Sequence, residues 1–401
     1  MTGTAGNKGD YIRSDCYVSV ELAQESGIEI NLRSKVASLY GDSIRNISLD
    51  ILNFFEIQHA KVTIEDKGAL DFVIAARLES AIKEVVSSEK EYLLPLTSEN
   101  TYHTDKDKPR RSRLYIPGNS PKLMINAGIH SADGVILDLE DSVAPDKKNE
   151  ARYLVRNALR SVNFYDAERM VRINQIPEGM NDLKYIVPHN VNLILLPKCE
   201  TAAQIKQVDE EISQIAKKSE HQIHLMPIIE SALGVINAYS IATASENIAA
   251  LAIGLEDYTA DIGAKRSEGG KESFYARSTI VNAASAAGIQ AIDSVYSDVS
   301  NMDGLRENVA NSKALGFVGM GCIHPRQVRI INTGFNPGQA EIEKAKAIVL
   351  AYEEAQRKGS GVTAIGSKMI DLPIVKRALT TLNTALSSGL LKENWRESEN
   401  E

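Results

Sequence analysis

The chain has 401 residues, a net charge of −8, and 43% hydrophobic and 24% charged residues, a composition typical of a globular protein of about two domains. The negative charge argues against a general nucleic-acid binder, and neither a signal peptide nor the roughly 18-residue apolar run of a membrane span is expected. The three cysteines lie far apart without CxxC spacing, which argues against a disulfide framework and favours a cytoplasmic protein.

Residues 1–87 form the first predicted unit. Alternating apolar and polar residues predict strands in CYVSVEL, EINLRS and AKVTIED. Apolar residues at helical spacing predict helices in SKVASLYGDSIRNISLDILNFF and LDFVIAARLESAIKEVV. We therefore expect a small α+β unit, and it holds no cluster of His, Cys or carboxylate residues that suggests chemistry of its own.

Residues 88–110 form a predicted linker. They are mostly polar, include two prolines and show no sustained hydrophobic period, which is typical of a flexible connection. The run from Lys106 to Arg113 is basic. A solvated linker is the simpler interpretation of that run, and a phosphate contact near Arg111 is the alternative.

Eight short apolar runs follow the linker and alternate with amphipathic helical stretches. This alternation is typical of a parallel sheet covered by helices on both faces, and eight units fit a (β/α)8 TIM barrel over residues 111–335. An open doubly wound sheet is the alternative, but no run leads into a GxGxxG turn. Residues 336–401 form a C-terminal helical extension, with helices predicted at 339–358 and 371–388. The predicted strands are Arg113–Pro117, Gly134–Asp141, Met170–Asn174, Leu193–Lys198, His224–Glu230, Ile248–Asp257, Gln290–Tyr296 and Phe317–Ile323.

Polar residues gather at the ends of these runs, where a TIM barrel has its active site, and we expect no charged residue at the strand starts. Glu230 and Asp257 end neighbouring strands, and two carboxylates with water and a chelating substrate are a typical Mg²⁺ site. Glu256 is expected to be structural because it points the other way along the pleat. Arg172 could stabilise an enolate, which suits carbon–carbon bond cleavage beside a carbonyl. The full set is Asp138, Glu140, Asp141, Arg172, Asn174, Lys198, Glu230, Glu256, Asp257, Asp293 and His324.

The motifs RSRLYIPGNSPKLM, GVILDLEDSVAPDKKNEAR, VRIN, LPKCE, PIIESALGV, GLEDY and IHPRQV occur in the order typical of one family. Over residues 110–390 the chain resembles the citrate lyase β-subunit family, which includes citryl-thioester and malyl-CoA lyases. The resemblance implies a trimer-forming barrel that performs Mg²⁺-dependent retro-Claisen cleavage, with Glu230 and Asp257 as metal ligands and Arg172 facing the thioester enolate oxygen. Asp371 resembles an aspartate that longer members supply to a neighbouring subunit's site, or it is only an N-cap. Arg111 and Lys122 are expected to contact the cofactor.

The first unit resembles a second family, the citrate lyase acyl carrier (γ) subunits, through EDKGALDFVIAARLESAI and GIEINLRSKVASLYGDSIRNISLDIL. That family carries a phosphoribosyl-dephospho-CoA arm on a serine, and Ser14 in YIRSD is the nearby candidate. The family's modified serine usually lies two residues before the aspartate, a position that is Arg13 here. An ordinary surface serine is therefore the alternative for Ser14.

These resemblances together predict a citryl-ACP lyase with its own acyl carrier domain, fused through a flexible linker that raises the effective concentration of the thioester. We expect citryl-thioester cleavage to oxaloacetate and acetyl-thioester, a homo-oligomer based on trimers, and an acyl-exchanging citrate lyase α subunit as partner. One alternative is a citramalyl- or malyl-CoA lyase acting on free CoA thioesters. Another is a non-catalytic acyl-carrier scaffold, which would not need Glu230, Asp257 and Arg172 together.

Overall fold

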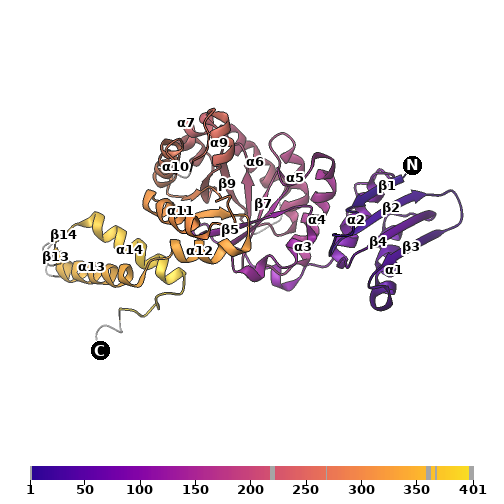
Figure 1. Cartoon of the computed structure of the whole chain (residues 1–401), viewed down its shortest axis with the longest axis horizontal. Coiled ribbons are helices and arrows are strands. Elements are labelled where there is room, and N and C mark those ends of the chain that lie inside the picture. Colours follow the sequence, from indigo (N-terminus) through magenta and orange to yellow (C-terminus); the bar gives the residue numbers. More distant parts are fainter. Residues whose placement is uncertain (1, 217–221, 268, 358–362, 366–367, 397–401) are drawn as a thin grey trace.

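The computed structural model describes residues 2–216, 222–267, 269–357, 363–365 and 368–396. It has three parts in a row: an N-terminal α+β unit, a central barrel and a C-terminal helical arm (Figure 1). No helix among the described residues is long and apolar enough to cross a membrane.

The N-terminal unit is a four-stranded sheet with two helices. Its strand order is β1-β2-β4-β3, in which β3 and β4 are parallel and the other pairs are antiparallel. The predicted strands and helices are confirmed, and β1 is an addition that the short, glycine-containing run TGTAG did not indicate. The elements are β1 (Thr2–Gly6), β2 (Cys16–Leu22), β3 (Ile28–Ser34), α1 (Ala37–Phe54), β4 (Ala60–Asp66) and α2 (Asp71–Lys83).

The central part is a closed barrel of eight parallel strands in chain order, which confirms the predicted TIM barrel. Side chains of one parity on each strand pack outward against the helices, and those of the other parity fill the barrel interior. The strands are β5 (Ser112–Pro117), β6 (Gly134–Asp138), β7 (Glu168–Arg172), β8 (Leu193–Leu196), β9 (His224–Ile229), β10 (Ala250–Ile253), β11 (Gln290–Asp293) and β12 (Gly319–Cys322).

Helices follow the barrel strands and cover its outside (Figure 1). They are α3 (Pro121–Met124), α4 (Lys148–Ser161), α5 (Gly179–Ile186), α6 (Ala202–Ile215), α7 (Ala232–Ile236), α8 (Ala238–Ala242), α9 (Leu255–Asp261), α10 (Phe274–Ala287), α11 (Met302–Leu315) and α12 (Pro325–Phe335), with short 3-10 turns at Ser98–Asn100, Gly128–His130, Pro145–Lys147 and Val187–His189.

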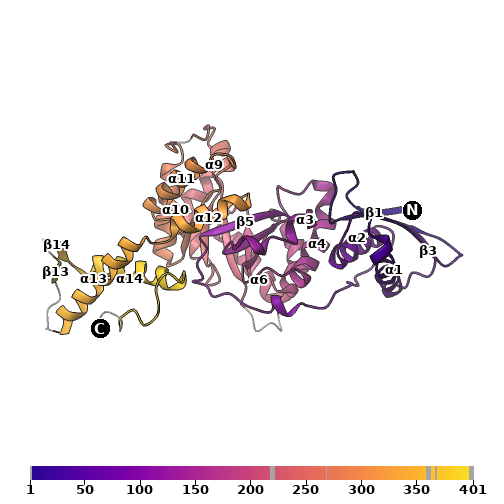
Figure 2. The same ribbon diagram turned by 60° about the horizontal axis from the view of Figure 1, so that its bottom comes forward.

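The segment 88–110 is bound to the barrel, so the expectation of a flexible linker is wrong. Figure 2 shows it running along the barrel from the N-terminal unit to β5. The buried Asn100 side chain donates to the carbonyl oxygens of Leu159 and Val162 at 2.9 and 2.6 Å. Arg110 forms a fully buried ion pair with Glu168 at 2.7 Å. The polar residues of the segment satisfy groups at the barrel surface, which their composition alone does not reveal.

The N-terminal unit is docked on the barrel through α2 and α4. Glu79 on α2 and Arg156 on α4 form an ion pair at 2.5 Å in which neither side chain is exposed. Arg77 on α2 pairs with Asp15 at 3.0 Å and lies 3.4 Å from Glu150 in the first turn of α4. Almost all of α2 is buried, because the sheet covers one side and α4 the other.

The C-terminal arm projects from the barrel (Figure 1). Its helices α13 (Gln339–Arg357) and α14 (Leu372–Ser387) pack against each other around a small core that includes Trp395. A short antiparallel hairpin, β13 (Thr363–Ile365) and β14 (Lys368–Ile370), lies between them in the chain. Both predicted helices are confirmed, although Lys358 at the predicted end of the first lies outside the described residues.

Candidate active site

A cavity of about 380 Å³ opens at the carboxyl ends of the barrel strands. It is lined by charged side chains at its mouth and by small or apolar ones deeper in the barrel. The lining includes seven of the eleven predicted strand-end residues, namely Asp138, Asp141, Arg172, Glu230, Glu256, Asp257 and Asp293.

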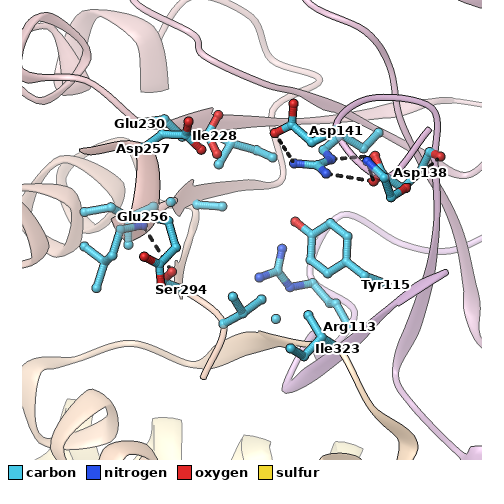
Figure 3. Close-up of a pocket in the computed structure, with 18 of the residues that line it drawn as sticks. Arg113, Tyr115, Asp138, Asp141, Ile228, Glu230, Glu256, Asp257, Ser294 and Ile323 are labelled. Atoms are coloured by element: carbon cyan, nitrogen blue, oxygen red, sulfur yellow. Dashed lines mark hydrogen bonds and ion pairs between the residues drawn. The ribbon is translucent and has the colours of Figure 1, made fainter. Parts of the chain in front are cut away.

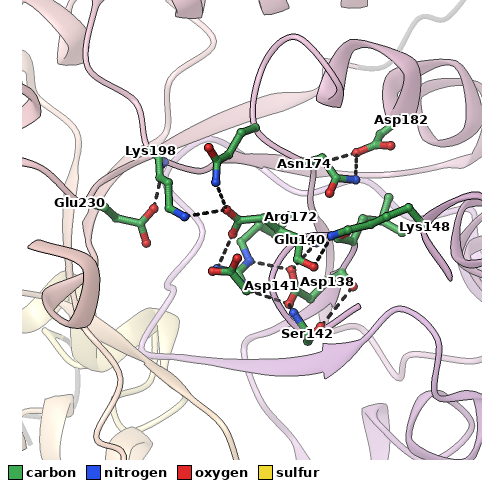
Figure 4. Close-up of polar contacts among 12 residues, drawn as sticks. Asp138, Glu140, Asp141, Ser142, Lys148, Arg172, Asn174, Asp182, Lys198 and Glu230 are labelled. Carbon is green, nitrogen blue, oxygen red and sulfur yellow. Dashed lines mark hydrogen bonds and ion pairs between the residues drawn. The ribbon is translucent and has the colours of Figure 1, made fainter. Parts of the chain in front are cut away.

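Arg172 is the last residue of β7. Two carboxylates hold its side chain, one at the end of the neighbouring strand β6 and one just after that strand (Figure 4). Its Nε and Nη2 donate to the two carboxylate oxygens of Asp138 at 2.6 and 2.7 Å, and its Nη1 lies 2.8 Å from Glu140 Oε2. Burial acts to lower the pKa of Arg172, but the hydrogen bonds and charge of Asp138 outweigh it and the pKa is raised. Arg172 is therefore a fixed cation at the edge of the cavity.

Glu230 and Asp257 lie side by side across the cavity (Figure 3). Glu230 directly follows β9, is 7% exposed, and accepts a hydrogen bond from the Lys198 backbone N–H at 2.9 Å. Burial raises the pKa of Glu230 to about 7, and the charges of Glu140 and Asp257 act in the same direction. The Lys198 ammonium lies 3.7 Å from both Glu140 and Asp257.

The position of Asp257 corrects the predicted strand. β10 ends at Ile253, and Glu256 and Asp257 lie in the first turn of α9 instead of on a pleat. Glu256 therefore does not point away from the cavity as a strand residue would; it lines the cavity and is paired with Arg266. The apolar run in the sequence continues past the end of β10 because Leu255, the first residue of α9, is also buried.

The pair Glu230 and Asp257 fits a hard divalent cation. Both offer carboxylate oxygens, the ligands Mg²⁺ prefers, and two protein ligands leave room for substrate oxygens and water. A cation would also offset the burial and the neighbouring acidic charges that together raise the pKa of Glu230. Within the described ranges no group of three or more His, Cys, Asp or Glu residues could hold a metal ion, so a cation at this pair would take its remaining ligands from substrate and water.

A glycine makes room for Glu230. A Cβ atom at Gly254, the residue between β10 and α9, would come within 2.4 Å of Glu230 Oε1 and 2.6 Å of its Cγ. Sequence reasoning missed this residue, because the contact joins two strands that only the closed barrel brings together.

Several predicted strand-end residues have other partners. Asp293 lines the cavity but is paired with Arg277, and Asn174 donates to Asp182 at 2.9 Å. His324 caps α12 by accepting from the Arg326 backbone N–H.

The residues expected to contact the cofactor do not line the cavity. Arg111 precedes β5 at the opposite end of the barrel and pairs with Asp133 at 2.7 Å. Lys122 is exposed on α3, after β5. Asp371 is the N-cap of α14 and accepts a hydrogen bond from the Ile374 backbone N–H at 3.3 Å. Within its own chain it therefore has the capping role given above as the alternative. Ser14 is half-buried in the loop before β2, with a φ of 55°.

The expectation of uncharged strand starts is wrong. Arg113 is the second residue of β5, and Glu168 and Arg169 begin β7. Arg113 and Tyr115 point into the barrel and line the cavity, whereas Leu114 and Ile116 pack outward. The period-2 alternation in RSRLYIP could have placed these two residues on the inner face.

A closed eight-stranded barrel with a fixed arginine and two neighbouring carboxylates at its strand ends is typical of a TIM-barrel enzyme with its active site at that end. Residues 111–325, more than half of the chain, match the HpcH/HpaI aldolase/citrate lyase family. The chain belongs to this family and is a carbon–carbon lyase. Residues 6–85 match the malonate decarboxylase delta subunit (MdcD), so an acyl-carrier-like domain is fused to the lyase.

Alignments with known proteins of this family extend over most of the chain. It is 39% identical to citrate lyase subunit beta of Leuconostoc mesenteroides subsp. cremoris, an alignment covering 72% of this chain and 97% of that protein. It is 33% identical to human mitochondrial citramalyl-CoA lyase, over 72% of this chain and 89% of that protein. Among solved structures it is similar to CitE from Mycobacterium tuberculosis in complex with magnesium, acetoacetate and coenzyme A, with a TM-score of 0.57, 29% identity, and coverage of 70% and 98%.

Proposed function

We propose that this lyase cleaves a citryl thioester carried on its own N-terminal domain into oxaloacetate and an acetyl thioester. The observation that supports this most is the Glu230–Asp257 pair facing the fixed Arg172, in a chain that also holds an acyl-carrier-like domain. The substrate is a 3-hydroxy-acyl thioester whose hydroxyl and adjacent carboxylate can chelate a cation.

In this proposal Glu230 and Asp257 hold Mg²⁺, which supplies Lewis-acid polarisation of the substrate hydroxyl when bound. A base takes the hydroxyl proton as the bond between the carbinol carbon and the thioester α-carbon breaks. The O–H electron pair forms the carbonyl of oxaloacetate, and the electron pair of the broken C–C bond forms the acetyl thioester enolate. Arg172, held rigid by Asp138 and Glu140, stabilises the negative charge on the enolate oxygen. Protonation of the enolate carbon completes the reaction.

We place the proton-transfer group on Asp371 of a neighbouring subunit. Asp371 is exposed on the arm, which projects away from the barrel of its own chain (Figure 1). In the proposed assembly based on trimers, Asp371 on this arm acts at the barrel mouth of a neighbouring subunit. The role predicts that Asp371→Asn loses turnover while retaining Mg²⁺ binding, and that mixing it with an inactive Glu230→Ala variant restores part of the activity.

The carrier role rests on Ser14 and its surroundings. Asp15, the next residue, is linked through Arg77 to Glu150 at the start of α4. Because α4 follows the carboxyl end of β6, the Ser14 loop is on the side of the barrel where the cavity opens. We propose Ser14 as the attachment site of a phosphoribosyl-dephospho-CoA arm, loaded with citrate by a separate acyl-exchanging α subunit. The intact mass of protein from its native host, mapped to Ser14, tests this assignment.

The metal assignment is tested by Mg²⁺-dependent citryl-thioester cleavage. Glu230→Ala and Asp257→Ala should each lower the rate at least 100-fold, because each removes one of the two protein ligands. Glu210→Gln is the control, since Glu210 is an exposed carboxylate on α6 outside the cavity lining. Unchanged cleavage by either alanine variant would contradict the assignment.

A second candidate is cleavage of citramalyl-CoA as a free thioester. It is favoured by the similarity to citramalyl-CoA lyase and by Arg13 at the position where carriers of this type have the modified serine. Unmodified Ser14 in protein that turns over free CoA thioesters would select this candidate.

A further inference from the structure

Arg113 is a buried cation without a protein counter-charge. It is 2% exposed, its Nε has no hydrogen-bond partner, and its Nη1 contacts only the weak acceptor Met226 Sδ, at 3.0 Å. Among the described residues no carboxylate forms an ion pair with it. Among the other fully buried arginines, Arg77, Arg110 and Arg156 each have a carboxylate partner. Arg169 has none, but it donates to the backbone oxygens of Asn190 and Tyr102, whereas Arg113 has only Met226 Sδ.

An unpaired buried charge is unfavourable, and a fold that keeps one is suited to an incoming ion of opposite sign. Burial lowers the pKa of Arg113, which reflects this missing counter-charge. The guanidinium lines the cavity described above, so an anion that enters the cavity can reach it. These observations point to an anion subsite in the deep part of the cavity.

This subsite lies apart from the Glu230–Asp257 pair. Figure 3 shows Arg113 and Tyr115 across the cavity from Glu230 and Asp257. The deep end is kept open by a glycine: a Cβ atom at Gly321 on β12 would lie 2.7 Å from Val295 and 3.1 Å from the Tyr115 ring. A ligand that chelates at Glu230 and Asp257 can therefore extend toward Arg113.

We propose that Arg113 binds a second carboxylate of the substrate, the one that leaves with the 2-oxo-acid product. This inference rests on the proposed function, because the first carboxylate is the one that chelates beside Glu230 and Asp257. It restricts the substrate class to thioesters whose oxo-acid half is a dicarboxylate. Citryl thioesters release oxaloacetate and meet this requirement, whereas citramalyl and malyl thioesters release pyruvate and glyoxylate and leave Arg113 unpaired.

We expect Arg113 to discriminate strongly between citryl and citramalyl thioesters. A site built to pair a polar group rejects analogues that lack it by about 10⁴-fold, whereas a methylene in an apolar pocket changes preference only about 10- to 200-fold. We expect the wild-type chain to prefer citryl over citramalyl thioester by at least about 100-fold in kcat/KM. Arg113→Met should remove most of this preference.

Binding can be tested without turnover by thermal unfolding of the full chain with Mg²⁺, using malate and lactate as stable hydroxy analogues of the two oxo acids. In the wild type, malate should raise Tm more than lactate at equal concentration, since only malate pairs with Arg113. Arg113→Met should lose the malate-specific part, keep the lactate shift and, because an unpaired charge is removed, show no lower Tm without ligand. Arg113→Lys should retain part of the malate preference.

Arg169→Met is the matched control. Arg169 is 1% exposed and also on a strand start, but it donates to the backbone oxygens of Asn190 and Tyr102 outside the cavity. This variant should lower Tm and keep the malate preference. Malate preference retained in Arg113→Met, or absent from the wild type, would overturn the subsite. Glu230→Ala separates the two proposals: loss of Mg²⁺-dependent lactate binding there supports the metal site, whatever Arg113 does.

Discussion

At the scale of single residues, the geometry of Glu230 depends on the missing side chain at Gly254. The carboxylate is packed against the Gly254 backbone and fixed by the Lys198 N–H. Gly254 has a φ of −110°, which any residue can adopt. Its role is therefore close packing against Glu230, and a methyl group is enough to disturb it.

Gly254→Ala should weaken Mg²⁺ binding at least about 10-fold, because its Cβ would displace the Glu230 carboxylate. The measurement is a calorimetric Mg²⁺ titration of the purified chain. Gly269→Ala is the control, since a Cβ there would meet no atom within 4 Å. Equal Mg²⁺ affinity in the two variants would show that Glu230 is not a ligand or that its position tolerates the shift.

Asp138 sets the orientation of Arg172 through two hydrogen bonds. Asp138→Asn keeps the shape but replaces one acceptor oxygen by a donor, so the guanidinium turns or loses one bond. We expect kcat to fall about 10- to 100-fold with little change in KM, because the lost interaction acts on charge that develops during bond cleavage. Steady-state kinetics check this, and a rise in KM alone would instead assign Arg172 to substrate binding.

At the scale of elements, the sequence predicts the eight strands well because each is a short, buried, apolar run between capped helices. It also predicts which rim residues converge, since carboxyl ends of parallel strands meet at one end of a barrel. It does not predict partners across the chain. The Asn100 and Arg110 side chains look like those of a solvated linker, and only the folded barrel provides Leu159, Val162 and Glu168 for them. Sequence reasoning also missed Arg113, because a charged residue is seldom fully buried and is not expected to point into a barrel.

The buried Arg110–Glu168 pair should make segment 88–110 part of the folding unit. Arg110→Met leaves the Glu168 carboxylate buried without its main partner, which costs about 3–5 kcal/mol of unfolding free energy. Denaturant unfolding measures this change. Arg306→Met is the control, because Arg306 pairs with Asp303 at the surface with 61% of its side chain exposed, where an ion pair contributes at most about 1 kcal/mol. A loss below about 1 kcal/mol for Arg110→Met would mean that the segment is dispensable for stability.

At the scale of the whole molecule, the carrier-like unit is held against the lyase barrel instead of swinging freely. Two charge clusters are buried in the interface, Glu79 with Arg156 and Asp15 with Arg77 and Glu150. Both involve α4, whose first turn follows the loop after β6, the strand that ends at Asp138. Under the proposed function, a docked carrier with its Ser14 loop on the cavity side would need only an attached thioester arm to move, so docking would add to the effective concentration that fusion provides.

Arg156→Met tests this consequence. It leaves Glu79 buried without its closest cation, so the docked arrangement is weakened while the cavity residues are untouched. Turnover of a thioester attached to the chain's own carrier should fall about 10-fold, whereas turnover of the same acyl group supplied on free CoA should not change. The radius of gyration from small-angle X-ray scattering should rise as the carrier unit separates. Lys90→Met serves as the control, because its pair with Glu56 lies at the surface of the carrier unit. If attached and free thioesters respond alike to Arg156→Met, docking has no part in delivering the substrate and the segment 88–110 alone sets the carrier's reach.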